Sequence, residues 1–438
     1  MGDLIHIYIG DFANKVGINF WNAISLEHGI DKTGEFVGVE PSQQLLNIRG
    51  FYDKTTDNKY IPRAIFTGAF VKTKIDVETA SDLFTNLVFR ETCFLHSDNK
   101  WAVGYNNYDE LVDEFLVKVA GMSESCENFL GFEITHGLEG TEGGFASKLI
   151  EKLRENYTDK IISTYSSCFS DITDQFGTSR SLNILTDNSD ATYCFDYVQL
   201  HGIYFKNLKM PIPTEDDIIK LFVNAMVGIT CRIRFDSVLY LKKFITNMVP
   251  FPRLHFFMVG CAPHWDPRGS SQLYRALTVH ELIQQCFDAK NMMCAADPRH
   301  GKYLTCATLF RERVSSNEDD APMNEVDVQM LNDVNKIHSY FVEWIPNSCK
   351  ASICDIPPKG LKMAGTLVGN NTAINELFNR YFNHCETYFA NAIAQNLDLN
   401  REFGMTEYEI TEVLTKMKEL IDDYSQYYVP DDVPVAEE

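Results

Sequence analysis

The chain has 438 residues, which is long enough for roughly two or three domains. Hydrophobic residues make up 45% and charged residues 23%, a balance typical of a folded protein that excludes a wholly disordered or fibrous chain. Aspartate and glutamate outnumber lysine and arginine by 61 to 39, and the formal net charge of -22 argues against binding to nucleic acid backbones. We therefore expect no nucleic acid partner.

Targeting and redox signals are weak in this chain. No segment has the ~18 uninterrupted apolar residues of a membrane span, and the first residues lack the basic flank of a signal peptide. We expect a cytoplasmic protein without a membrane partner. The 12 cysteines contain no C-x-x-C pair, which favours reduced, mostly buried thiols over a metal site.

The first half of the chain alternates strand-like and helical patterns. Residues 4–9 are β-rich and end at Gly10, and apolar residues then recur at helical spacing through residue 24. The pattern returns at residues 129–135, which lead through the glycine-containing stretch 137–144 into a second helix. These repeated strand–turn–helix units predict an α/β fold with any ligand at the carboxyl ends of the strands.

A second unit begins near residue 198. Within it, apolar residues recur at helical spacing at residues 218–225 and predict a helix. The strand-like runs at 254–258, 339–344 and 361–368 predict a further mixed α/β unit. Two helices are expected at residues 374–393 and 406–427, the second opened by a capping box of Thr406 and Glu409. A short acidic tail follows at 431–438.

Several longer sequence motifs resemble the tubulin family, and in particular its β type. The clearest is Cys-Asp-Ile-Pro-Pro-Lys-Gly-Leu-Lys-Met at residues 354–363. The other matching motifs lie at residues 27–31, 60–65, 247–258, 274–279, 287–293, 297–301 and 340–347. The resemblance covers essentially the whole chain and implies a tubulin-like α/β fold of three parts: a Rossmann-like GTPase domain at residues 1–197, an intermediate domain with a core helix at 198–370, and a helical hairpin with the tail at 371–438.

The resemblance also implies a GTP site with magnesium, in which glycines let backbone N–H groups approach the phosphates. The family motif at the phosphate-binding loop is Gly-Gly-Gly-Thr-Gly-Ser-Gly. The corresponding segment of this chain is one residue shorter and brings Glu139 and Glu142 into that loop. A carboxylate about 4 Å from a phosphate oxygen costs ~4 kcal/mol at an effective dielectric of about 20, so we predict poor GTP binding or none. The positions that carry over to this degraded site are Gly10, Asp11, Asn99, Gly140, Thr141, Gly143 and Gly144.

Other departures from the family pattern favour the same prediction. Asp11 and Phe12 replace a phosphate-side Gln and Cys, and Gly-Ala-Phe at residues 68–70 replaces the acidic word associated with magnesium. At the guanine end, residues that contact or stack on the base are replaced by Tyr197, Glu215 and Ile219. We therefore assign no catalytic residue.

Ordinary structural roles for these positions stay open. The glycines of residues 140–144 can simply make a turn, and Asp11 can cap the helix that follows it. Phe70 and Tyr197 can pack into the space that a nucleotide would fill.

The resemblance places α-tubulin against the opposite face of this chain. Lys243 stands where the α chain has a catalytic glutamate and the β chain a lysine, and a cation there can neutralise a phosphate but cannot deprotonate water. A solvated surface lysine is the plain alternative. The predicted partner interface consists of Lys243, Asn247, Pro250 and Arg253. The lateral loop at 262–274 is altered, and the tail is shorter and less acidic than in the family.

The sequence thus predicts a structural β-tubulin-like subunit that pairs with α-tubulin in specialised cytoplasmic microtubules, such as those of a cilium or basal body, with a degraded exchangeable GTP site. One alternative is an ordinary GTP-binding β-tubulin of dynamic microtubules, whose altered loops still hold the phosphates. The other is a regulator that sequesters α-tubulin.

Overall fold

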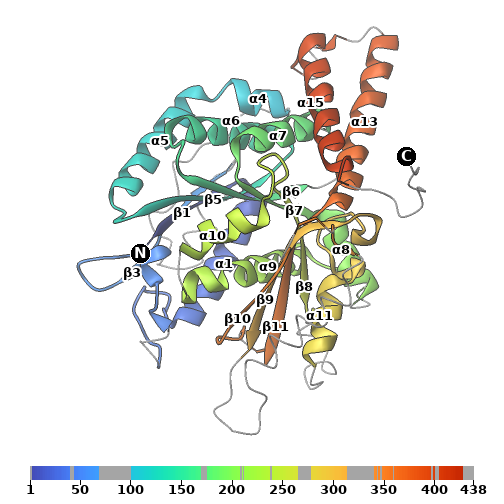
Figure 1. The fold of residues 1–438 in the computed structure, drawn as a ribbon. Coiled ribbons are helices and arrows are strands. Elements are labelled where there is room, and N and C mark those ends of the chain that lie inside the picture. The colour runs from blue at the N-terminus through green and yellow to red at the C-terminus, as the bar shows by residue number, and fades with distance from the viewer. Residues whose placement is uncertain are drawn as a thin grey trace.

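The computed structural model describes residues 2–39, 44–68, 100–168, 175–207, 210, 212–236, 239–264, 278–312, 340–342, 344–345, 348–358, 360–395, 398–399 and 404–427. These residues form a nine-stranded sheet in the order β10-β9-β11-β8-β7-β6-β5-β1-β4, and β2 and β3 form a separate ribbon (Figure 1). The run from β4 to β8 is parallel, whereas β11 lies antiparallel to both β8 and β9. The strands are β1 (Asp3–Ile9), β2 (Tyr52–Lys54), β3 (Tyr60–Pro62), β4 (Ala64–Thr67), β5 (Phe129–Gly137), β6 (Ile161–Cys168), β7 (Ala191–Asp196), β8 (Phe256–Ala262), β9 (Tyr303–Glu312), β10 (Cys349–Cys354) and β11 (Met363–Asn371).

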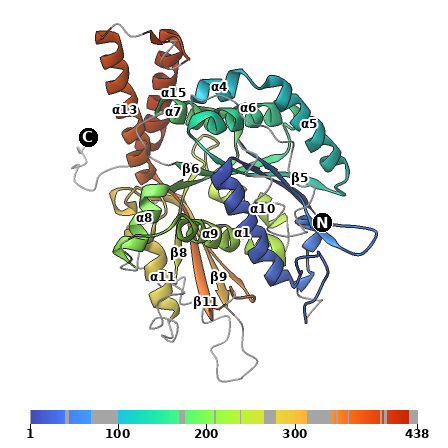
Figure 2. The same ribbon diagram turned by 180° about the vertical axis from the view of Figure 1, so that it is seen from behind.

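Helices cover both faces of the parallel strands, with α4 to α7 on one face and α1 and α9 on the other (Figures 1 and 2). Strand β1 shows why both faces are covered: Ile5, Ile7 and Ile9 join one hydrophobic cluster, while Leu4 and Tyr8 join the other. The helices are α1 (Asp11–His28), α4 (Trp101–Asn106), α5 (Asp109–Glu124), α6 (Gly140–Asn156), α7 (Gln175–Asn188), α8 (Tyr197–Lys206), α9 (Glu215–Phe235), α10 (Leu239–Met248), α11 (Val279–Phe287), α13 (Asn375–Ala394) and α15 (Glu407–Ser425). None of the helices in the described ranges is long and apolar enough to cross a membrane.

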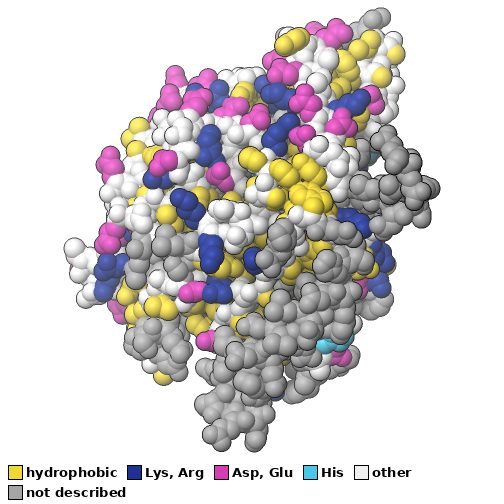
Figure 3. Space-filling model, in the orientation of Figure 1, with side chains coloured by type: hydrophobic (Ala, Val, Ile, Leu, Met, Phe, Trp, Pro, Cys, Tyr) yellow, Lys and Arg dark blue, Asp and Glu magenta, His cyan; other side chains and the backbone are white. Residues whose placement is uncertain are grey.

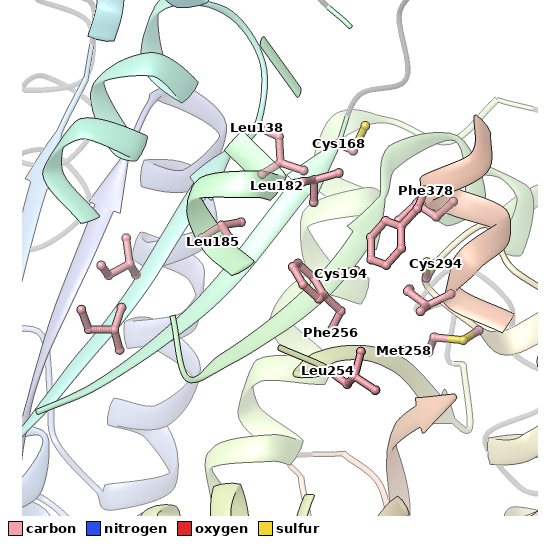
Figure 4. Close-up of a cluster of buried hydrophobic side chains, with 14 of the residues drawn as sticks. Leu138, Cys168, Leu182, Leu185, Cys194, Leu254, Phe256, Met258, Cys294 and Phe378 are labelled. Carbon is pink, nitrogen blue, oxygen red and sulfur yellow. The ribbon is translucent and has the colours of Figure 1, made fainter. Parts of the chain in front are cut away.

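The helices α13 and α15 form a hairpin that extends beyond the body of the molecule (Figures 1 and 2). Its base is anchored in the core, where Phe378 of α13 meets Phe256 of β8 edge to face with ring centroids 5.2 Å apart (Figure 4). The hydroxyl of Tyr424 in α15 also accepts a hydrogen bond from the backbone N–H of Phe256 at 3.2 Å. These contacts fix the hairpin to the sheet through fully buried groups.

Most of the predicted elements are confirmed, and two needed correction. The strand predicted at residues 339–344 is wrong: the described residues 340–342 and 344–345 contain only an isolated bridge between Tyr303 and Phe341. Trp344 is half exposed and packs on the rings of Phe251 and Tyr427 instead of entering the sheet. The strand predicted at 254–258 begins only at Phe256, because the N–H of Leu254 closes a turn onto the carbonyl of Phe251. The three-part domain division stays a prediction.

A buried acid lies between the neighbouring strands β5 and β1 of the sheet. Glu133 of β5 and His6 of β1 are 2% and 1% exposed, and the Glu133 Oε2 atom lies 3.3 Å from His6 Nδ1. Burial raises the pKa of Glu133 to about 8, although nearby Arg234 opposes the shift, and burial lowers the pKa of His6 to about 3. Both side chains are therefore mainly uncharged at neutral pH.

Glu133 makes a contribution to stability that falls as the pH rises. Between the ordinary pKa of 4.5 and about 8, folded Glu133 keeps a proton that the unfolded chain releases, so its contribution to the free energy of unfolding decreases across that window. Glu133→Gln removes the titration and is expected to be more stable than the wild type at pH 9 by a few kcal/mol, on the order of 2–4, with little difference at pH 5. Urea unfolding across this pH range is the measurement, and parallel profiles for the two proteins would contradict the prediction.

Candidate nucleotide-binding site and partner face

Two helices begin side by side at the carboxyl edge of the sheet. Strands β1 and β5 are parallel neighbours, with Ile9 paired to His136, so the turns that follow them meet. Gly10, the N-cap of α1, has a φ of 100°, and Gly140, the first residue of α6, has a φ of 65°. These are conformations that favour glycine, and they aim both helix N-termini at one place. Gly10, Asp11, Gly140 and Thr141 of the predicted site are therefore brought together.

The side chain of Glu142 lies at the N-terminus of α1. Its Oε1 atom accepts a hydrogen bond from the backbone N–H of Asp11 at 3.3 Å. A Cβ atom on Gly10 would lie only 2.2 Å from Oε2 of the same carboxylate. The first N–H groups of a helix and its dipole favour an anion, which is why phosphates bind there. In this arrangement, a phosphate at that helix end would meet a carboxylate.

Gly144 of α6 and Gly104 of α4 allow close packing of the two helices. A Cβ atom on Gly144 would lie 2.0 Å from the carbonyl oxygen of Trp101, and one on Gly104 would lie 1.9 Å from that of Thr141. The hydroxyl of Thr141 donates to the carbonyl of Lys100 at 3.3 Å. The predicted glycine turn is thus corrected, because Gly140, Gly143 and Gly144 lie in the first turns of the helix itself.

Asp11 does not cap α1 as the sequence suggested. The N-cap position belongs to Gly10, and no side chain of the cap residue bonds the helix. Asp11 occupies the first helical position instead, because the turn after β1 needs a positive φ that glycine adopts most easily.

The base end of the site holds aromatic side chains. Tyr197 packs against Phe12 with ring centroids 6.1 Å apart, and Phe12 packs edge to face on Phe222 at 6.0 Å. Ile219 is 1% exposed. Tyr197 is half-buried beside Phe12, and its role toward a nucleotide stays a prediction. Burial, together with the carboxylate of Glu215, raises the pKa of Tyr197, while Lys15 lowers it.

The sequence analysis missed two basic side chains near this region. Lys15 of α1 pairs with Glu215 of α9 at 2.7 Å, and both charges act on Tyr197. The guanidinium of Arg180 in α7 lies over the rings of Trp101 and Tyr105, at 4.6 and 4.8 Å from their centroids. Neither residue belongs to a recognisable sequence motif, so their positions near the candidate site are evident only from contacts between helices that are distant in the sequence.

Several predicted residues lie outside the described ranges. Asn99 and Phe70 belong to this group, as do most of the altered lateral loop and the acidic tail. Within the described ranges, no three His, Cys, Asp or Glu side chains come together in a way that could hold a metal ion. A phosphate at the N-terminus of α1 would meet the Glu142 carboxylate, so the described residues fit a magnesium-bound nucleotide poorly at its phosphate end.

The predicted partner residues flank the end of α10. Lys243 and Asn247 are exposed one helical turn apart, and Pro250 is half-buried. Arg253 is also exposed, and its guanidinium pairs with Asp423 of α15 at 2.8 Å. Figure 3 shows hydrophobic surface gathered beside the base of the α13–α15 hairpin. The end of α10 is held rigidly, since the carbonyl of Met248 accepts hydrogen bonds from Thr305 and Asn370 at 2.7 and 3.1 Å.

Comparison with known proteins identifies the class to which this fold and site belong. Residues 3–205 match the GTPase domain of the Tubulin/FtsZ family, and residues 252–383 match the tubulin C-terminal domain. The chain is 44% identical to the tubulin beta-5 chain of Ectocarpus variabilis and 45% identical to the tubulin beta-6 chain of the same organism. Each comparison covers 98% of this chain and 95% of the relative. The chain belongs to the tubulin family, and its resemblance to the β type is confirmed.

Proposed function

We propose that this protein is a β-tubulin-like structural subunit that pairs with α-tubulin and serves specialised microtubules of the cytoplasm, including those of a cilium or basal body. The similarity to β-tubulin chains over nearly the full length supports the proposal. A structural role also requires a rigid surface for each neighbour. The anchored end of α10 and the hairpin of α13 and α15 meet that requirement in the described part of the chain.

In this proposal the nucleotide site of the subunit is degraded. The observation that carries this conclusion is the Glu142 carboxylate at the N-terminus of α1, where a phosphate of GTP would need those N–H groups. The packing of Tyr197 on Phe12 supports it at the base end. The subunit then holds GTP poorly or not at all, and magnesium has no role in it.

The Lys243 face is proposed to cover the nucleotide of α-tubulin. An exposed ammonium group can neutralise a phosphate across the interface, but it cannot act as a base toward water. The subunit therefore leaves that nucleotide intact. Asn247 lies one helical turn further along the same exposed face, and Pro250 follows it.

The nucleotide content of the heterodimer tests the proposal. The full-length chain is purified with its α-tubulin partner, denatured to release nucleotides, and analysed by chromatography per mole of dimer. One GTP per dimer is expected, because only the α-type site keeps its phosphate cradle. A heterodimer containing a β chain with the intact glycine-rich word is the control and should release two nucleotides. Two nucleotides from the present chain would overturn the degraded site and favour an ordinary GTP-binding β-tubulin.

A further inference from the structure

The N-cap position of α1 supplies no side chain to the N-terminus of this helix, although Asp11 in its first turn is acidic. The N-cap residue is Gly10, which has no side chain, and no side-chain cap bonds the first turn. The hydrogen bond to Asp11 N–H comes from Glu142, which lies 131 residues away and on another helix. Such a distant partner implies that the two helix ends are held in register by the pairing of β1 and β5.

The position of Glu142 makes one carboxylate serve two helix ends. Glu142 lies in the first turn of α6, so the dipole of its own helix favours its negative charge. Its oxygens at the same time face the first turn of α1. Glu139, the other glutamate of the altered segment, behaves differently, because it accepts a hydrogen bond from the thiol of Cys168 at 3.2 Å. Glu139 thus has a described contact with β6, whereas Glu142 has a described contact with α1.

We infer that the Glu142 carboxylate is a built-in anion that takes the place of a nucleotide phosphate at the N-terminus of α1. This inference rests on the proposed function and adds a mechanism to it: the site is closed by the chain's own side chain, and the fold is completed without nucleotide. Gly10 leaves room for the Glu142 side chain, since a Cβ atom at residue 10 would lie 2.2 Å from the carboxylate. In the family motif the residue that follows the threonine is glycine, so Glu142→Gly restores the family residue of the phosphate-binding loop at this position.

The test uses the full-length chain and two variants of this residue. Glu142→Gly opens the cradle, and Glu142→Gln keeps the side-chain volume while removing its charge. Glu155→Gln is the matched control, because Glu155 lies near the end of the same helix and pairs with Lys152 on the surface. Binding of a fluorescent GTP analogue is followed by anisotropy, and the melting temperature is measured without ligand and with inorganic tripolyphosphate.

Glu142→Gly is expected to bind the GTP analogue at least about tenfold more tightly than the wild type, because a carboxylate no longer opposes the phosphates. Glu142→Gln should show a smaller gain in affinity. Both variants should melt at a lower temperature than the wild type without ligand, and tripolyphosphate should restore part of the loss. Glu155→Gln should behave like the wild type in every measurement.

The outcomes separate this inference from the proposed function. A wild type that already binds the analogue tightly overturns the degraded site and, with it, the closure of the site by Glu142. Variants that bind no better than a non-binding wild type overturn the inference while the degraded site stands. If both variants fail to fold without ligand, rescue by tripolyphosphate supports the inference and failure of rescue overturns it.

Discussion

Glu27→Gln is expected to lower the free energy of unfolding by about 3–5 kcal/mol, because it leaves two buried cations without their counter-charge. The carboxylate of Glu27 in α1 accepts hydrogen bonds from Arg234 of α9 at 2.7 Å and from Arg311 of β9 at 2.9 Å. The side chains of the two arginines are 0% and 2% exposed. Urea unfolding followed by circular dichroism at pH 7 measures the loss.

The pH dependence of this variant gives a second readout. Burial by itself would raise the pKa of Glu27, but the charges of Arg234 and Arg311 outweigh it and hold the pKa below the ordinary 4.5. A carboxyl with a lowered pKa stabilises the fold at neutral pH, and that contribution is lost as the pH falls through the lowered pKa. Glu27→Gln should therefore lose less stability than the wild type on acidification below about pH 4.5.

The control for this variant is Glu127→Gln. Glu127 also pairs with an arginine, Arg49, but their side chains are 75% and 57% exposed. A surface pair of this kind contributes about 0–1 kcal/mol, so its loss should be small. Equal effects of the two substitutions would mean that the buried triad is not the source of the stability.

Gly144→Ala is expected to cost about 3 kcal/mol or more, because there is no room for one methyl group between α6 and α4. The added Cβ would lie 2.0 Å from the carbonyl oxygen of Trp101 and 2.8 Å from the backbone nitrogen of Tyr105. Both atoms belong to the backbone, so relief requires α4 to move as a whole. The melting temperature should fall in the absence of any nucleotide, which separates this packing role from phosphate binding.

Gly121→Ala is the matched control, with an expected effect of the opposite sign. Gly121 lies in α5, and a Cβ atom there would have nothing within 4 Å. Alanine is favoured over glycine inside a helix by about 0.5–1 kcal/mol, so this variant should be more stable than the wild type. A Gly144→Ala protein with an unchanged melting temperature would show that α4 and α6 are not closely packed.

Local patterns in the sequence predicted the elements that carry strong signals. The strand at 4–9 and the helix after Gly10 are confirmed as β1 and α1, since the apolar spacing matches the two periods. The capping box of Thr406 and Glu409 is also confirmed, with Glu409 Oε2 accepting from the Thr406 N–H at 2.7 Å. The word at residues 27–31 has a structural meaning, because Gly29 ends α1 with a φ of 67°.

The candidate site was predicted less completely. The residues at the ends of β1 and β5 could be named from the family pattern, and the parallel pairing of these strands brings them together. The strand expected near Trp344 failed because aromatic contacts with Phe251 and Tyr427 outweigh a β-like composition. Lys15 and Arg180 could not be found, since their partners lie on helices far away in the chain.

The amino-acid sequence by itself determined the family, the strand–turn–helix units at residues 4–24 and 129–153, and the presence of two glutamates where the family has glycines. Only the tertiary structure decided what each glutamate does. Glu139 is the N-cap residue of α6, with an extended backbone that turns its side chain toward Cys168, whereas Glu142 is helical and faces α1. Residues three positions apart take opposite roles because the pairing of β1 and β5 brings the start of α1 beside one of them, and no local pattern encodes that contact.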